Sequence, residues 1–355
     1  MAQTRTFFRI LLLALLAGVP SFTAAVGPDR NLHSVLQQTV EDLRISEGKP
    51  WGVIVSGLAA AAITDANGAK QVVAVASGAA DPPGDIPLKT GDRFHIGSIT
   101  KSFTAALIMQ LNQEGKLSLN EPIEKWIQYP NGSNITIKML LGHTSGVPNH
   151  TDNPGHKPTN TPLQSIALSA QQKPVFAPGT SWSYSNTNYI ILGVIAEKAT
   201  ASTWQKQLES RFFEPLALSD TYVWNGKAVA KTVTGSRLNC GYPGEPDCVE
   251  QPGFKIIPET AGADWTVAWS AGAIVSTPTD VARWMRALVS GNVLDAEHRA
   301  LLTTPTRESV KVLANKPPYG TLRWTGGSLG LLRFEIEGVG VGWGTRVPSM
   351  GSSPT

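Results

Sequence analysis

The sequence has few of the residues on which several protein classes depend. Among 355 residues it has only two cysteines, and charged residues make up 16% of the chain, with a formal net charge of +3. This cysteine content excludes a disulfide-dense scaffold. No block of basic residues occurs, so nothing indicates a nucleic-acid partner. The rest of the composition, 41% hydrophobic, is typical of a globular chain that is long enough for a large core.

The sequence also lacks long apolar runs. A short one lies near the start. Residues 10–17 are apolar, follow Arg5 and Arg9, and precede small residues at 23–25. This order is typical of a secretory signal peptide at residues 1–25, with cleavage expected after Ala25. The run is too short to span a bilayer comfortably, so we expect no stable membrane span in the mature chain. We therefore expect a secreted or periplasmic location.

The two cysteines, Cys240 and Cys248, flank a loop rich in proline and glycine. Because an exported chain meets oxidising conditions, we expect a disulfide between them. A metal site would need more ligands nearby. His143, His150 and His156 lack the tight spacing of ligands on one helix, and two of them fall in a loop, so we expect no metal.

Ser98 and Lys101 stand three residues apart at the head of an apolar run, residues 102–111. On a helix, that spacing puts both side chains on one face, and a helix that is apolar on nearly every side is buried. Burial lowers the pKa of a lysine, so Lys101 could take the proton of the Ser98 hydroxyl. The alternative is that Ser98 caps the helix and that Lys101 reaches water.

A second pair of polar residues, Tyr184 and Asn186, precedes an apolar helix expected at 187–200. A phenol near a lysine can share its proton, and an amide can hold a substrate carbonyl. The alternative is that Asn186 is the helix N-cap and that Tyr184 is a half-buried aromatic side chain.

The order of expected elements predicts the architecture. After an amphipathic helix at 29–46, two strands are joined by a hairpin turn, and the middle of the chain is largely helical. We expect an α+β fold, in which an antiparallel sheet built from both ends of the chain is flanked by helices, with an inserted all-helical subdomain. The long loop at 147–161 is expected to be disordered or to cover a site. The expected strands are 51–63, 71–76, 320–323 and 331–342, and further helices are expected at 162–171 and 203–212.

Together, Ser98-x-x-Lys101 and Tyr184-x-Asn186 resemble motifs of the serine β-lactamases and penicillin-binding proteins. The nearest branch holds class C β-lactamases, D-alanyl-D-alanine carboxypeptidases and related esterases. Residues 140–146 and 269–280 also resemble framework stretches of that family. The resemblance implies a β-lactamase/transpeptidase-like serine hydrolase domain at residues 26–344, followed by an atypical tail at 345–355.

The resemblance implies a role for each motif residue. Ser98 would be the nucleophile that forms an acyl-enzyme, Lys101 would assist its deprotonation, and Tyr184 would be the shared general acid and base. Asn186 would bind the substrate amide, and His143 would be a framework residue. The substrate would be a small molecule or a peptidoglycan-type peptide with an amide, ester or β-lactam carbonyl, and no cofactor is expected.

The third family motif, His-x-Gly or Lys-Thr-Gly on a sheet-edge strand, is not found in its usual form. Trp324-Thr325-Gly326 resembles it, with a tryptophan in place of the basic residue, but it follows Gly320 too closely to leave room for a hairpin. The strand that ends at Gly344 is better placed, yet no His-x-Gly follows. A second hypothesis is therefore a catalytically impaired or inactive penicillin-binding relative.

A rival motif surrounds Ser328. Residues 326–330 match Gly-x-Ser-x-Gly, the nucleophile elbow of α/β-hydrolases. That motif needs a helix after the serine and a later histidine, whereas a strand is expected there and His298 is the last histidine. The sequence therefore argues against an α/β-hydrolase.

We predict that the residues after Gly344 are out of the ancestral reading frame or truncated. Codons permitted for residues 344–355, read from one base earlier, can spell a segment that contains His-x-Gly. The chain as written would then lack half of the oxyanion hole, and losing one oxyanion donor costs about 10²–10³ in rate. The nucleotide sequence tests this. An immediate stop codon in the shifted frame, or no encoded His-x-Gly, contradicts it and leaves Trp324-Thr325-Gly326 as the motif to test.

Overall fold

The computed structural model describes residues 14–16, 32–48, 57–66, 69–80, 86–227, 232–233, 236–238, 256–258, 265–316, 322–336 and 340–344. Cys240, Cys248, the tail at 345–355 and most of the expected signal peptide lie outside these residues, so the predicted disulfide and reading-frame shift stay predictions. None of the described helices combines the length and the hydropathy that crossing a membrane requires.

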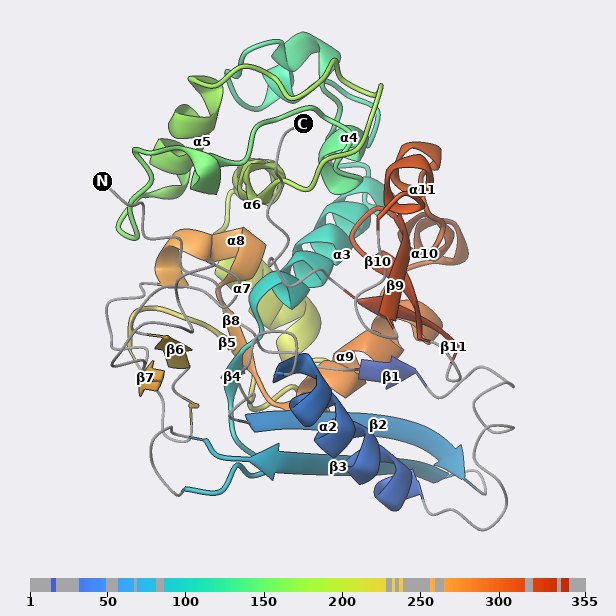
Figure 1. Cartoon of the computed structure of the whole chain (residues 1–355). Helices are drawn as coiled ribbons and strands as arrows, with labels where there is room; N and C mark the ends of the chain where they lie inside the picture. The colour runs from blue at the N-terminus through green and yellow to red at the C-terminus, as the bar shows by residue number, and fades with distance from the viewer. Residues whose placement is uncertain are drawn as a thin grey trace.

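Helices α3 to α7 follow one another in the middle of the chain, and strands lie before and after them, as expected for an α+β fold (Figure 1). The helices are α2 (Leu32–Gly48), α3 (Thr100–Gln113), α4 (Ile137–Leu141), α5 (Pro162–Ala170), α6 (Asn186–Thr200), α7 (Trp204–Leu208), α8 (Trp269–Gly272), α9 (Pro278–Ser290), α10 (Ala296–Thr303) and α11 (Arg307–Leu313). The strands are β1 (Ala14–Leu16), β2 (Gly57–Ala66), β3 (Ala69–Gly78), β4 (Phe94–His95), β5 (Tyr222–Val223), β6 (Ser236–Leu238), β7 (Ile256–Pro258), β8 (Ile274–Ser276), β9 (Leu322–Gly327), β10 (Leu332–Ile336) and β11 (Gly340–Gly344).

The expected N-terminal hairpin is present as β2 and β3, which pair in antiparallel register. Neighbouring residues of β2 face opposite helices, because side chains alternate across a strand. Ala60 and Ala62 pack with Leu36 of α2, whereas Ala61 packs with Ala282 of α9. Small side chains on β2 therefore let two helices lie close to the hairpin, one on each face.

The C-terminal strands depart from the expected arrangement. The single strand expected at 331–342 is two antiparallel strands, β10 and β11, because alternating apolar residues indicate a strand but do not reveal a reversal of the chain. The single sheet expected from both ends of the chain is also wrong for the described residues. They form a β1–β2–β3 sheet and a separate β9–β10–β11 sheet (Figure 1). Strand β1, which pairs with β2 and contacts β11, belongs to residues 1–25, the segment expected to be cleaved.

Helix α3 runs through the middle of the molecule and contacts α6, α7 and α8 (Figure 1). It is buried on every side over most of its length, as its apolar sequence predicts. Phe103 stacks on Trp284 of α9 with 3.9 Å between ring centroids. The central helix is therefore fixed by contacts with both the helical part and the helix that covers the N-terminal sheet.

The 143–146 turn and the 175–183 segment run side by side. The Ser183, Gly179 and Val175 N–H groups donate to carbonyls of the 143–146 turn at 3.0, 2.8 and 2.9 Å. Gly146, the last residue of that turn, has φ +73°, and a Cβ there would lie 2.1 Å from the Phe176 carbonyl oxygen. Only glycine fits this close approach, which brings the 183–186 segment to the head of α3.

We predict that Gly146→Ala lowers the free energy of unfolding by more than about 2 kcal/mol, because it combines a left-handed conformation with a clash against backbone. Gly115→Ala is the matched control. Gly115 has φ +69°, and a Cβ there would meet nothing within 4 Å, so its cost should be about 1 kcal/mol. Urea unfolding measures both, and equal losses would contradict the importance of the 143–146 contact.

Candidate active site

Ser98 lies in a 3₁₀ turn, Gly97–Ile99, that leads directly into α3. Gly97 has φ +51°, which lets the chain turn from β4 into the helix. Neither the turn nor α3 has a side-chain cap, so the hypothesis that Ser98 caps the helix is wrong. The Ser98 hydroxyl instead faces two other side chains: the Tyr184 hydroxyl donates to it at 2.7 Å, and Lys101 Nζ lies 3.1 Å away.

Lys101 is 2% exposed, so the alternative that its ammonium reaches water is also wrong. Its Nζ donates to Asn186 Oδ1 at 2.8 Å and to the Ala271 carbonyl at 2.6 Å. Ser98 Oγ is its third polar neighbour. Three chain segments that are far apart in the sequence therefore meet at one nitrogen.

Burial holds the pKa of Lys101 well below its ordinary value of 10.5, because removal from water disfavours the ammonium. A neutral amine has two N–H groups and one lone pair. Asn186 Oδ1 and the Ala271 oxygen can only accept, so they take the two N–H groups. The lone pair then faces Ser98 Oγ, which is the arrangement of a base beside its nucleophile.

Tyr184 and Asn186 reach the site from the start of α6. Ser185 occupies the N-cap position and Asn186 is the first helical residue, so the prediction that Asn186 caps this helix is wrong. Its side chain is directed to Lys101 instead, while its N–H donates to Asn149 Oδ1 at 3.1 Å. Lys101 Nζ also lies 5.0 Å from the centre of the Tyr184 ring.

The Ala271 carbonyl is placed by the close approach of α6 and α8. A Cβ on Gly193 would lie 2.4 Å from Ser270 Oγ, so a larger residue would push the two helices apart. The Ser270 hydroxyl donates to the Tyr189 carbonyl at 2.9 Å across this contact. This close packing brings α8 to the Lys101 amine.

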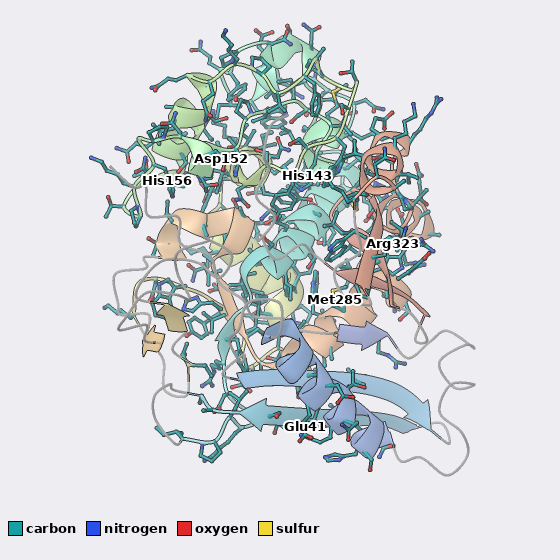
Figure 2. All side chains as sticks on the ribbon, in the orientation of Figure 1. Glu41, His143, Asp152, His156, Met285 and Arg323 are labelled. Carbon is teal, nitrogen blue, oxygen red and sulfur yellow. The ribbon has the colours of Figure 1, made fainter. Side chains whose placement is uncertain are left out.

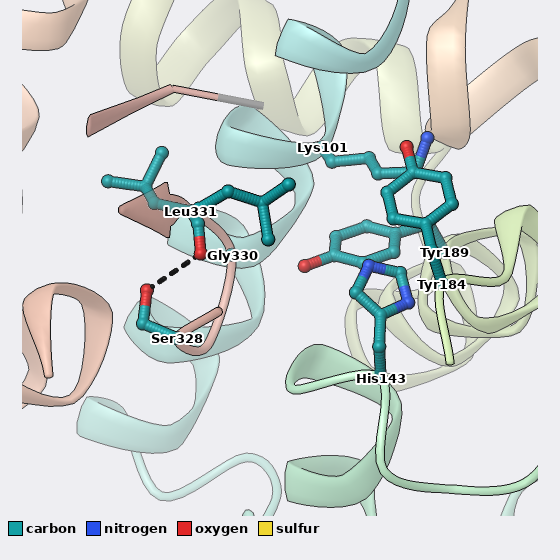
Figure 3. Close-up of a pocket in the computed structure, with 8 residues that line it drawn as sticks. Lys101, His143, Tyr184, Tyr189, Ser328, Gly330 and Leu331 are labelled. Carbon is teal, nitrogen blue, oxygen red and sulfur yellow. Dashed lines mark hydrogen bonds between the residues drawn. The ribbon is translucent and has the colours of Figure 1, made fainter. Parts of the chain in front are cut away.

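A small cavity lies beside the Lys101 side chain. Figure 3 shows the Lys101 amine beside the Tyr184 hydroxyl, with the rings of Tyr189 and His143 near them and the turn of Ser328 across the gap. The cavity holds about 10 Å³, about the space of one water molecule. Its lining residues are Lys101, His143, Tyr184, Tyr189, Ser328, Gly330, Leu331 and Leu332.

The three residues of the third-motif candidate lie on β9 and make different contacts. Trp324 packs on the apolar cluster of Trp182, Leu313 and Leu332, against which Tyr184 also packs. Thr325 Oγ1 accepts from Arg333 Nη1 at 2.7 Å, and a Cβ on Gly326 would lie 2.5 Å from Pro305. Trp324 therefore shares a cluster with Tyr184, whereas Thr325 and Gly326 contact neighbouring strand and loop residues.

Ser328 is 2% exposed, and its single hydroxyl proton is shared between the Leu302 and Leu331 carbonyls. Strand β9 precedes it and β10 follows it, as the argument against a nucleophile elbow predicts. A buried hydroxyl with two carbonyl acceptors is a structural group.

The loop at 147–161 is described throughout, and part of it is buried against α6. His150 Nδ1 lies 3.1 Å from Thr187 Oγ1, and burial lowers the pKa of His150 to about 3. Its ring meets that of His156 edge-on at 5.3 Å between centroids. Figure 2 shows His156 and Asp152 on the outer side of the helical part, away from His143. Within the described part of the chain, no three acidic, histidine or cysteine side chains gather in a possible metal site.

Two partners of the site are not predictable from the sequence pattern. The Ala271 carbonyl binds Lys101, and the Asn149 side chain binds the Asn186 N–H. The framework stretch at 269–280 is the one signal that points towards Ala271. A backbone carbonyl leaves no mark in a residue pattern, so its contact is visible only in the fold.

The family model described as Beta-lactamase matches residues 52–345. The chain belongs to the beta-lactamase family. This confirms the resemblance to serine β-lactamases and penicillin-binding proteins, and the β-lactamase/transpeptidase-like fold with its helices and antiparallel sheets. The family is one of serine hydrolases.

Among curated relatives, Penicillin-binding protein 4* of Bacillus subtilis (strain 168) is 25% identical over 274 residues, which are 70% of this chain and 59% of that protein. The chain therefore spans less than two thirds of that relative. Among solved structures, a D-stereospecific amidohydrolase from Streptomyces sp. is 26% identical, with a TM-score of 0.68 over 90% of this chain and 88% of the other. A D-amino acid amidase from Ochrobactrum anthropi SV3 is 24% identical, with a TM-score of 0.72 over 89% and 86%, and shows the shared fold.

We predict that acylation of Ser98 speeds up as pH rises and levels off below the range in which an exposed lysine titrates. The reaction needs neutral Lys101, and burial lowers the pKa at which its ammonium loses a proton. Labelling rates with a fluorophosphonate across pH measure this. Lys101→Met should slow labelling by about 10²–10⁴ and remove the pH dependence.

Lys198→Met is the matched control, because the Lys198 amine is exposed and donates to the Trp126 carbonyl. It should leave both the rate and the pH profile unchanged. A wild-type profile that rises only near pH 10.5, or one that Lys101→Met retains, would contradict the role of Lys101 as the base.

Proposed function

We propose that this chain is an exported serine hydrolase that opens an amide, ester or β-lactam carbonyl through an acyl-enzyme on Ser98. The observation that carries the proposal is the position of Ser98 Oγ, 2.7 Å from the Tyr184 hydroxyl and 3.1 Å from the buried Lys101 amine. The nucleophile is therefore within hydrogen-bond reach of both a base and a second proton carrier.

The chemistry follows from these contacts. Ser98 Oγ attacks the substrate carbonyl carbon as its proton moves to Lys101 Nζ, and the Ser98 N–H at the head of α3 faces the developing oxyanion. Tyr184 gives its proton to the leaving amine or alkoxide and regains one from Lys101. The C–N or C–O bond breaks and an ester to Ser98 remains. Water then attacks this ester, giving up its proton to the same pair, and releases the acid and free Ser98.

The relatives narrow the substrate class that we propose. They include a penicillin-binding protein and an amidohydrolase named for D-stereospecificity, each about a quarter identical to this chain. We propose amides and peptides of D-amino acids, of the D-alanyl-D-alanine carboxypeptidase type, with β-lactams as the other acylating class. Asn186 would hold the substrate amide next to Lys101. Such substrates fit a secreted or periplasmic enzyme, which the pattern of residues 1–25 supports.

A fluorophosphonate and a fluorescent penicillin should label Ser98 in the purified chain, and hydrolysis of a panel should favour D- over L-amino acid amides. Ser98→Ala should abolish labelling and turnover. Ser290→Ala, which removes an exposed hydroxyl on α9, should leave both unchanged. A label that maps elsewhere, or one that persists in Ser98→Ala, would overturn the assignment.

The second candidate is an impaired penicillin-binding relative that is acylated but turns over slowly. Thr325 is bound to Arg333, and Gly326 lies close to Pro305. These two residues of the third-motif candidate thus contact other parts of the protein rather than a substrate site, which favours this candidate. Intact-mass measurement separates the two candidates. A penicilloyl adduct that persists, with no hydrolysis of any substrate in the panel, would support the second.

A further inference from the structure

His143 occupies a conformation that few side chains adopt. It follows Gly142 at the end of α4 and has φ +57°, in the left-handed region. Its side chain is nevertheless 6% exposed, directed inward and in the lining of the cavity beside Lys101. A non-glycine residue in this region costs about 1–3 kcal/mol of conformational energy, so other contacts of His143 must offset this energy.

The ring nitrogen of His143 is bound to the second-motif segment. The Ser185 N–H donates to Nδ1 at 3.2 Å, and Asn188 Nδ2 lies 3.2 Å from the same atom. Nδ1 must therefore present its lone pair, which requires the tautomer that carries its proton on Nε2. Ser185 stands directly between Tyr184 and Asn186, so this bond fixes the residue that joins them.

Two further contacts fix the same segment from either side. The His143 ring stacks on the Tyr184 ring, with 4.5 Å between centroids and 28° between planes. The His143 carbonyl accepts from the Ser183 N–H at 3.0 Å. One residue thus holds the backbone before Tyr184, the ring of Tyr184 and the backbone after it.

We propose that His143 is a positioning residue, whose Nδ1 accepts from the Ser185 N–H so that the Tyr184 hydroxyl stays directed at Ser98 and Asn186 Oδ1 stays directed at Lys101. The inference rests on the proposed function and goes beyond it, since His143 touches no reacting atom. A misplacement of about 1 Å can cost about 10²-fold in rate, so a bond that fixes this segment affects acylation directly.

Two substitutions separate the hydrogen bond from the rest of the side chain. His143→Asn keeps an acceptor near the position of Nδ1, whereas His143→Gly removes it. Asparagine and glycine both tolerate the left-handed conformation, so neither change adds backbone strain. His298→Asn is the control, because His298 is another buried histidine, bonded to Asp295 and Asn112 away from the site.

Acylation of the full chain by a fluorophosphonate is measured together with the midpoint of thermal unfolding. His143→Gly should slow acylation by at least about 10-fold, and His143→Asn should stay within about 3-fold of the wild type. In a Tyr184→Phe background, His143→Gly should have a much smaller effect, because the hydroxyl it positions is gone. Equal losses in both variants, or the same loss with and without the Tyr184 hydroxyl, would overturn the proposal.

Hydrogen exchange gives a readout that does not depend on activity. The Ser185 amide should exchange faster in His143→Gly than in His143→Asn, and the His298→Asn control should match the wild type at that amide. If the wild type is not labelled at all, the proposed function fails. Hydrogen exchange still tests whether His143 Nδ1 holds the Ser185 N–H. Unchanged exchange of the Ser185 amide in His143→Gly would overturn the positioning role by itself.

Discussion

The buried amine of Lys101 is the constraint on which the site depends. A lysine removed from water favours its neutral form and needs a partner for each N–H group and for its lone pair. These partners are Asn186 Oδ1, the Ala271 carbonyl and Ser98 Oγ, from three different segments. Movement of any one of them leaves a buried polar group unpaired, so the structure around α3 has to hold all three in place.

Close backbone contacts supply that rigidity. Gly193 lets α6 lie against Ser270 of α8, and Gly146 lets the 143–146 turn lie against the Phe176 carbonyl. Each of these glycines lies where a segment that carries a site residue meets its neighbour, and a side chain at the contact would separate the two.

Local parts of the fold and site could be predicted from the sequence because they depend on short-range periodicity. The three-residue spacing of Ser98 and Lys101 and the apolar run behind them predicted one face of a buried helix. The structure has a buried helix, α3, that carries Lys101, with Ser98 in the 3₁₀ turn that leads into it. The C-terminal strands were predicted less well. Apolar alternation at 331–342 indicated a strand but not the reversal between β10 and β11, and pairing partners of a strand depend on the whole sheet.

The sequence by itself determined which side chains are chemically suited to the site: a serine, a lysine, a phenol and an amide, in two short motifs at the starts of two apolar helices. Only the tertiary structure decided what these groups face. Every residue has a backbone carbonyl, so the residue type of Ala271 does not indicate that its carbonyl binds Lys101. The stacking of His143 on Tyr184 depends on how two loops pair. The same packing removes Lys101 from water, and this burial lowers the pKa of its amine, which suits it to act as a base.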